Sequence, residues 1–171
     1  MTREKLVTTS SEKEISLTKS GLTEAESILR RHRLAERLAV DVLKVDLKRA
    51  HEEAHRLEHA FSPYLESRVV DILGHPTTCP FGHPIPGSNY VSNNSSVSLN
   101  KAKVGHDYLV DMLPEDDMEL LGYFVDNDFL PGAHIQITDL SNSRGVITLK
   151  LGNKELVFSM GISNLIRVIP G

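Results

Sequence analysis

The sequence has almost no cysteine, no tryptophan and few aromatic residues of any kind: Cys79 is alone among 171 residues, and aromatic side chains make up 5%. A single cysteine excludes an internal disulfide and any thiolate-rich zinc or iron–sulfur site. Because no histidine and acid pair surrounds Cys79 in a recognisable arrangement, we expect a packed, unreactive thiol. His75 and His83, in the same stretch, are expected to be ordinary loop histidines.

Long apolar runs are also missing. No segment approaches the roughly 20 apolar residues that span a bilayer, and the amino end lacks the charged, apolar and small-residue order of a signal peptide. The net charge of −4 gives no strong excess of either sign, which argues against nonspecific nucleic-acid binding by the chain as a whole. We therefore expect a cytoplasmic protein with no membrane segment.

Histidine, by contrast, is concentrated, because four of the eight histidines fall between residues 32 and 59. His51, His55 and His59 recur every four residues, which places them beside one apolar face of a helix. His51 and His59 lie about 12 Å apart along that helix, too far to share one ion whose bonds are about 2 Å long. The stripe therefore predicts two half-sites, and His55, Glu58 and His59 have the spacing to share one metal.

A second helical stretch can complete the other half-site. His32 and Glu36 stand four residues apart, project from one face and continue an apolar stripe, so they lie where two helices would cross. Together with His51 they form the first expected site. The same pattern also fits solvated, mixed-charge helix faces, and spacing alone leaves both interpretations open.

A rival interpretation comes from the segment His51-Glu52-Glu53-Ala54-His55, which satisfies the H-E-x-x-H pattern of zinc peptidases. Such an enzyme needs a third ligand and a substrate cleft, whereas the preceding sequence offers a hairpin and one helix. Glu52 is expected to point away from the apolar face toward solvent. We therefore predict that the chain is not an enzyme and keep the peptidase only as a remote alternative.

Taken in order, the patterns predict a hairpin, three helices, a loop and a β domain. The expected elements are a hairpin over residues 5–18 with its turn at 10–14, a helix from Thr18 or Thr23 to Val45, a ligand helix over 48–61, a helix from Pro63 (cap Ser62) to Gly74, and a loop over 74–96. From residue 97 the period becomes that of short strands. Strands are expected over 108–113, 134–140, 146–151, 156–158 and 166–169, with a short helix over 118–124. Five such strands in about 75 residues predict a small closed barrel.

These motifs together resemble one family. The segments RRHRLAERL, AHEEAHRLEHAFS and CPFGHPIPG are similar to the dimerisation and metal-binding domain of the diphtheria toxin repressor family, which includes iron-dependent and manganese-dependent repressors. The resemblance implies an α+β fold: a remnant β-hairpin wing (residues 1–20), a helical dimerisation and metal-binding domain (21–90), and a Src-homology-like, FeoA-like five-stranded β-barrel (91–171). It covers the whole chain, but the helices that precede the wing in the family are not found before it here.

The resemblance also implies ligands. His32, Glu36 and His51 match the family's first metal site, and Glu58 and His59 match the second. His55 stands where iron-responsive members have cysteine and manganese-responsive members have glutamate, so the sequence departs from both patterns. In the barrel, Glu115 is the best candidate for a further ligand, ahead of Asp116. Fe²⁺ or Mn²⁺ is the expected ion, and Zn²⁺, Co²⁺ and Ni²⁺ are also compatible with imidazole.

The implied function is that of a metal-dependent transcriptional repressor controlling metal-homeostasis genes. A homodimer is expected, with interface candidates Leu38, Val42, Val69 and Ile72. Operator DNA is the expected partner of a full-length form, whereas this chain, without helices ahead of the wing, is not expected to read operator sequence. The alternative is a metal-sensing homodimer that acts through protein partners.

Overall fold

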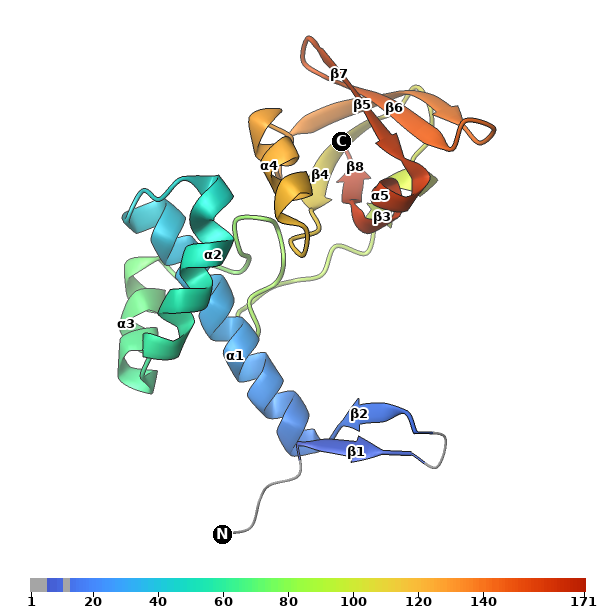
Figure 1. Cartoon of the computed structure of the whole chain (residues 1–171). Helices are drawn as coiled ribbons and strands as arrows, with labels where there is room; N and C mark the ends of the chain where they lie inside the picture. Colours follow the sequence, from blue (N-terminus) through green and yellow to red (C-terminus); the bar gives the residue numbers. More distant parts are fainter. Residues whose placement is uncertain (1–5, 11–12) are drawn as a thin grey trace.

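The structure is a computed structural model that describes residues 6–10 and 13–171 (Figure 1). One long helix runs from an N-terminal hairpin into a small helical bundle, and a loop then leads into a separate β domain. Two residues of the predicted turn at 10–14, Ser11 and Glu12, lie outside the described residues. The arrangement agrees with the predicted order of a wing-like hairpin, a helical domain and a β domain.

The helical half consists of consecutive elements whose starts are set by side-chain caps. They are α1 (Lys19–Arg37), η1 (Leu38–Val42, a π-helical turn), α2 (Leu47–Leu57), η2 (Glu58–Ala60) and α3 (Pro63–Ile72). The side chain of Thr18 accepts from the backbone N–H of Gly21, which confirms Thr18 rather than Thr23 as the start of α1. Ser62 caps α3 as predicted. Within the described residues, none of the helices combines the length and apolar character needed to cross a bilayer.

The hairpin pairs β1 (Val7–Thr9) with β2 (Ile15–Leu17) and lies against the start of α1. Gly21 makes this contact possible, since a Cβ there would come within 1.9 Å of the Leu6 carbonyl oxygen. That same oxygen accepts from the backbone N–H of Thr18 at 3.0 Å. The strands are therefore anchored at their base, while Ile15 and Leu17 remain exposed.

The β domain contains one antiparallel six-stranded sheet with the order β3-β8-β4-β5-β6-β7. Its elements are β3 (Val97–Ser98), η3 (Leu99–Lys101), β4 (Asp107–Met112), α4 (Met118–Asp126), β5 (His134–Ser141), β6 (Val146–Leu151), β7 (Lys154–Ser159), α5 (Met160–Leu165) and β8 (Arg167–Pro170). The five predicted strands and the predicted helix α4 are present. The prediction of a closed five-stranded barrel was wrong, because the described sheet has six strands and its outer strands, β3 and β7, do not pair with each other. The prediction missed the two-residue strand β3 and the short helix α5, because neither is long enough to show a period.

The helical half and the β domain each have their own hydrophobic core, and the loop between them contributes buried residues to both cores. Cys79 and Phe81 are fully buried in the core of the β domain, whereas Ile85 is buried among the helices. Gly82 crosses β4 so closely that a Cβ would lie 2.0 Å from the carbonyl oxygen of Asp111. The segment expected as a loop, residues 74–96, is therefore packed, and we call it the strap because it fixes the β domain against α1.

Candidate metal centre

The helices α1 and α2 bring together the three residues of the first predicted site. His32 Nε2 lies 3.1 Å from His51 Nδ1, and Glu36 Oε1 lies 3.2 Å from the first of these atoms and 3.0 Å from the second. Separations of this size suit ligands that share one ion through bonds of about 2 Å. Ala50 and Ala54, both fully buried, form the face of α2 that packs inward. The three polar side chains therefore fit a divalent metal ion.

The residues of the second predicted site are connected to the first through Glu58 on η2. Glu58 Oε1 lies 3.5 Å from both His55 Nδ1 and His59 Nε2, while its other oxygen lies 2.7 Å from His32 Nδ1. Glu58 is buried, but the side chain of His59 is 79% exposed. The structure thus places all six predicted helical residues in one continuous network.

His55 lies close to the first set as well. Its ring centroid is 4.6 Å from that of His32 and 4.8 Å from that of His51. Among the described residues, two groups of three can offer donor atoms within 4.8 Å of one another. We call the first the imidazole group, His32, His51 and His55, and the second the thiol–carboxylate group, Glu36, Cys79 and Glu115.

The thiol–carboxylate group joins the two domains. Glu36 comes from α1, Cys79 from the strap, and Glu115 from the segment between β4 and α4, with Cys79 Sγ 3.6 Å from Glu115 Oε2. Glu115 is the barrel residue that the sequence favoured, whereas Asp116 is exposed and belongs to neither group. The sequence interpretation missed Cys79 as a possible ligand. No local signal identifies it, because only the packing of the strap on the β domain brings it to Glu36.

Two atoms beside this group lack partners. Glu36 Oε2 and Arg33 Nε are both buried without a hydrogen bond. The guanidinium of Arg33 lies 3.6 Å from Glu115 Oε1 and donates to the carbonyl of Pro84. A buried carboxylate oxygen with no partner costs free energy unless a cation or proton reaches it. The group is therefore a place where a bound cation would be stabilised.

The protonation equilibria reflect this crowding of charge. Burial alone would raise the pKa of Glu36, but hydrogen bonds from His32 and His51 overcome it and hold the pKa at about 2. Burial would lower the pKa of His32, yet the adjacent carboxylates of Glu36 and Glu58 raise it above its ordinary value. Burial, followed by the charges of Glu36 and Glu115, raises the pKa of the Cys79 thiol. A metal ion binding here must displace protons from His32 and Cys79.

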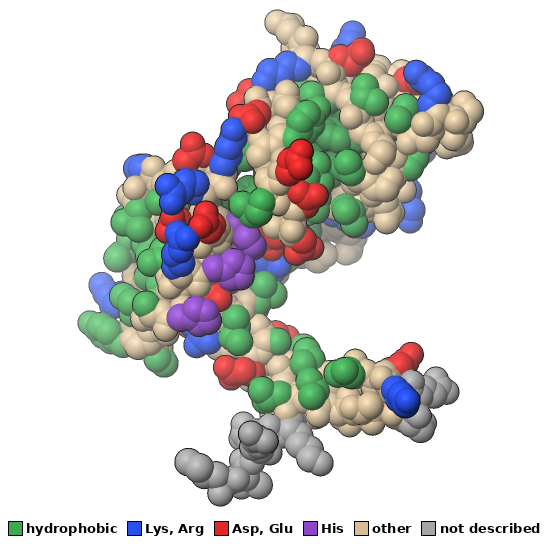
Figure 2. All heavy atoms as spheres, viewed as in Figure 1, with side chains coloured by type: hydrophobic (Ala, Val, Ile, Leu, Met, Phe, Trp, Pro, Cys, Tyr) green, Lys and Arg blue, Asp and Glu red, His purple; other side chains and the backbone are tan. Residues whose placement is uncertain are grey.

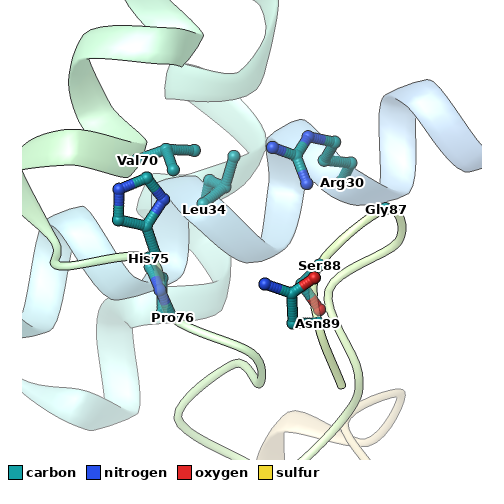
Figure 3. Close-up of a pocket in the computed structure, with 8 residues that line it drawn as sticks. All are labelled: Arg30, Leu34, Val70, His75, Pro76, Gly87, Ser88 and Asn89. Atoms are coloured by element: carbon teal, nitrogen blue, oxygen red, sulfur yellow. The ribbon is translucent and has the colours of Figure 1, made fainter. Parts of the chain in front are cut away.

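A cavity of about 100 Å³ lies elsewhere, between α1, the end of α3 and the strap (Figure 3). Its polar lining includes Arg30, His75 and Asn89. The guanidinium of Arg30 is already bound to Glu66 at 2.6 Å and to the carbonyl of Pro86 at 2.7 Å. His75 belongs to neither ligand group, so this cavity adds nothing to the metal centre.

For the peptidase interpretation, the structure offers a third histidine as a metal ligand, but the glutamate that would act as general base points away from the site. His51 and His55 do meet His32. Glu52, however, has a side chain that is 55% exposed and paired with Arg56 on the outer face of α2. A general base must lie beside the metal-bound water, so this orientation does not support peptide hydrolysis.

Histidine side chains gather on the helical half of the face shown in Figure 2, whereas acidic side chains lie on both halves. The family model for the iron-dependent repressor metal-binding and dimerisation domain matches residues 18–87, and the FeoA domain model matches residues 97–170. The iron-dependent repressor IdeR of Mycobacterium leprae is 31% identical over 98% of this chain and 78% of its own length. The chain belongs to the diphtheria toxin repressor family.

Other members show the same relationship. The diphtheria toxin repressor of Corynebacterium diphtheriae is 29% identical, again over 98% of this chain and 78% of that protein. A manganese-dependent transcriptional repressor in complex with manganese superposes with a TM-score of 0.83 at 27% identity, over 97% of this chain and 78% of the other. ScaR with bound Zn²⁺ gives 0.81 at 27% identity, over 98% and 84%. The resemblance inferred from the sequence motifs is confirmed, and so is the fold class.

Proposed function

We propose that this member of the family is a metal-dependent transcriptional regulator in which a divalent transition metal ion links the helical domain to the β domain. The observation that carries the proposal is Glu36 Oε2, a buried carboxylate oxygen without a hydrogen-bond partner, in a group with Cys79 and Glu115. Relatives described as iron-dependent and manganese-dependent repressors support Fe²⁺ or Mn²⁺ as the class of ion. A bound ion would give Glu36 Oε2 the partner that it lacks.

Residues from the helices and from the β domain would contribute different ligands to the metal centre. His32, Glu36 and His51 would hold an ion between α1 and α2, while Cys79 and Glu115 would extend the centre to the β domain. The remaining helical residues of the network are His55, Glu58 and His59. Because the thiol–carboxylate group exists only when the strap and the β domain are in place, an ion that binds there favours the docked arrangement. By preferring that state, it shifts the population toward it.

A homodimer is part of the proposal. Val42 and Ile72, two of the predicted interface residues, expose 43% and 62% of their surface, and the apolar side chains of Leu43 and Tyr64 are also exposed. Leu38 is partly buried against the helical core, and Val69 was a wrong candidate, because only 3% of it is exposed within one chain. Sedimentation at micromolar concentration with metal present should give a species of twice 19.0 kDa. A single 19.0 kDa species under those conditions would count against the dimer.

The docking mechanism can be tested by amide hydrogen exchange with and without Mn²⁺ or Fe²⁺. We expect metal to slow exchange at the backbone N–H of Cys79, which donates to the carbonyl of His83 within the strap. The backbone N–H of Leu113, which follows β4 and donates to the carbonyl of Phe81 on the strap, should slow as well. Glu115→Gln should remove the protection. Glu119→Gln, an exposed acid on α4, is the matched control. Equal protection in both variants would show that the β domain lends no ligand.

Repression itself requires the complete DNA-binding unit. In a protein that carries DNA-reading helices and acts in the cytoplasm, we expect metal to increase affinity for operator DNA. The readout is fluorescence anisotropy with excess competitor DNA, since phosphate contacts alone give salt-sensitive, sequence-independent binding. Specific binding that does not change on metal removal would contradict the proposal.

A further inference from the structure

Three imidazole rings converge at the crossing of α1 and α2. The ring centroids of His32, His51 and His55 are 4.6 to 4.8 Å apart in every pairing. One nitrogen atom from each ring lies within 4.8 Å of a nitrogen of the other two. His51 and His55 are on successive turns of α2, so a single helix face supplies two of the rings. His32 supplies the third from α1.

The neighbouring carboxylates settle which atoms face the centre. Glu58 Oε2 lies 2.7 Å from Nδ1 of His32, so this nitrogen can donate to Glu58 while the other nitrogen binds an ion. Nε2 of the same ring then points to His51 and to Glu36. A carboxylate that holds the far nitrogen of a histidine is the usual partner of a metal-binding ring. Glu58 is therefore a positioning residue for His32.

We propose that His55 completes a centre of three imidazoles and the Glu36 carboxylate, and that this donor set makes the site selective for a nitrogen-preferring ion of the zinc class over Mn²⁺. The inference rests on the proposed function, since it specifies which ion the regulator's helical site prefers.

The chemistry follows from the donor atoms. Imidazole suits zinc, nickel and iron, whereas carboxylate, carbonyl and water ligands suit manganese. Three nitrogen atoms and one oxygen also satisfy the four-coordinate, tetrahedral preference of Zn²⁺. His55 is the adjustable member, because 61% of its side chain is exposed and its closest acid, Glu58, lies 3.5 Å away. Because its ring lies at the exposed edge of the site, it can be replaced without disturbing the core.

The test compares Zn²⁺ and Mn²⁺ affinities by competition calorimetry in the unaltered chain and three variants. In the His55→Glu variant, an oxygen ligand replaces the imidazole, and we expect the ratio of zinc to manganese affinity to fall by about 10- to 100-fold. His55→Ala should weaken Zn²⁺ by a similar factor and leave Mn²⁺ nearly unchanged. His134→Ala is the matched control, because its imidazole is also exposed but lies on β5 and belongs to neither ligand group.

Co²⁺ gives an independent readout, since four-coordinate Co²⁺ absorbs visible light much more strongly than six-coordinate Co²⁺. The intense absorption should be present in the unaltered chain and in His134→Ala and should be lost in His55→Ala. Circular dichroism checks that each variant folds. If the chain binds ions but His55→Ala keeps both the absorption and the zinc preference, the inference is wrong while the proposed function stands. If the unaltered chain binds none of these ions, the proposed function itself fails.

Discussion

The imidazole group and the thiol–carboxylate group lie side by side, with Glu36 hydrogen-bonded to the first and part of the second, yet they are assembled differently. The first is built from α1 and α2, which are consecutive in the chain and share one hydrophobic core. The second needs the strap and the segment before α4, both of which pack on the β domain. The difference teaches that one centre can form within the helical domain alone. The other forms only after the two domains dock.

Removing the side chain of Phe81 should have the largest effect on this comparison. Phe81 is fully buried in the core of the β domain, although it lies two residues from Cys79 on the strap. We expect Phe81→Ala to lower the free energy of unfolding by about 3–5 kcal/mol, as for other buried aromatic truncations. Urea denaturation measures the loss, and metal titration should show that only the thiol–carboxylate group is weakened.

Ile85→Ala provides the counterpart, because Ile85 lies on the same strap but is buried among the helices. It should cost about 2–5 kcal/mol and should weaken the imidazole group as well. If both substitutions affect the two groups equally, the distinction between a helical centre and an interdomain centre is not valid.

The next largest effect is expected from Glu36→Gln, because Glu36 bonds to His32 and His51 of the first group and belongs to the second. Changing a residue beside a metal ligand typically costs 10- to 100-fold in affinity, so loss of a ligand itself should exceed about 100-fold. Calorimetry should show that both binding phases weaken together. Glu26→Gln, an exposed acid on the same helix, is the control and should bind as the unaltered chain does.

Cys79→Ser distinguishes the two groups by the number of protons released when an ion binds. Because burial and the charges of Glu36 and Glu115 raise the pKa of the Cys79 thiol, it is protonated at neutral pH in the metal-free chain. Binding of an ion at the thiol must then release about one proton, and affinity should increase about tenfold per pH unit below that pKa. The serine variant should lose this proton release, measured as the buffer dependence of the binding enthalpy. An unchanged proton count would exclude Cys79 as a ligand.

The sequence was sufficient for what depends on short spacing. The four-residue intervals of His51, His55 and His59, and the pair His32 and Glu36, placed these side chains on helix faces, and the structure has those helices close to the predicted bounds. The β domain followed from alternating strands with tight turns. The short strand β3 and the helix α5 were missed because they contain two and six residues.

The sequence was insufficient where packing between distant segments decides. The axial separation along one helix suggested two half-sites, but it could not show that Glu58 touches His32 on the other helix. Cys79 looked like an ordinary packed thiol because its neighbours Glu36 and Glu115 are far away in the sequence. The residue-level division of ligands between two ions and the domain boundaries at residues 20 and 90 stay predictions.

The smallest expected effect concerns an exposed ion pair between the two domains, formed by Lys48 on α2 and Asp126 on α4. Both side chains are substantially exposed, 41% and 62%, so water and salt screen their attraction. A double-mutant cycle with Lys48→Met and Asp126→Asn should give a coupling of about 0.2–1 kcal/mol in metal-free chain. Breaking the pair should lower the metal affinity of the thiol–carboxylate group by no more than about fivefold, because 1 kcal/mol corresponds to about that factor. Loss of a buried ligand should cost far more. A coupling several times larger, or a clear loss of metal affinity, would mean that surface charge rather than the buried group determines how the β domain docks.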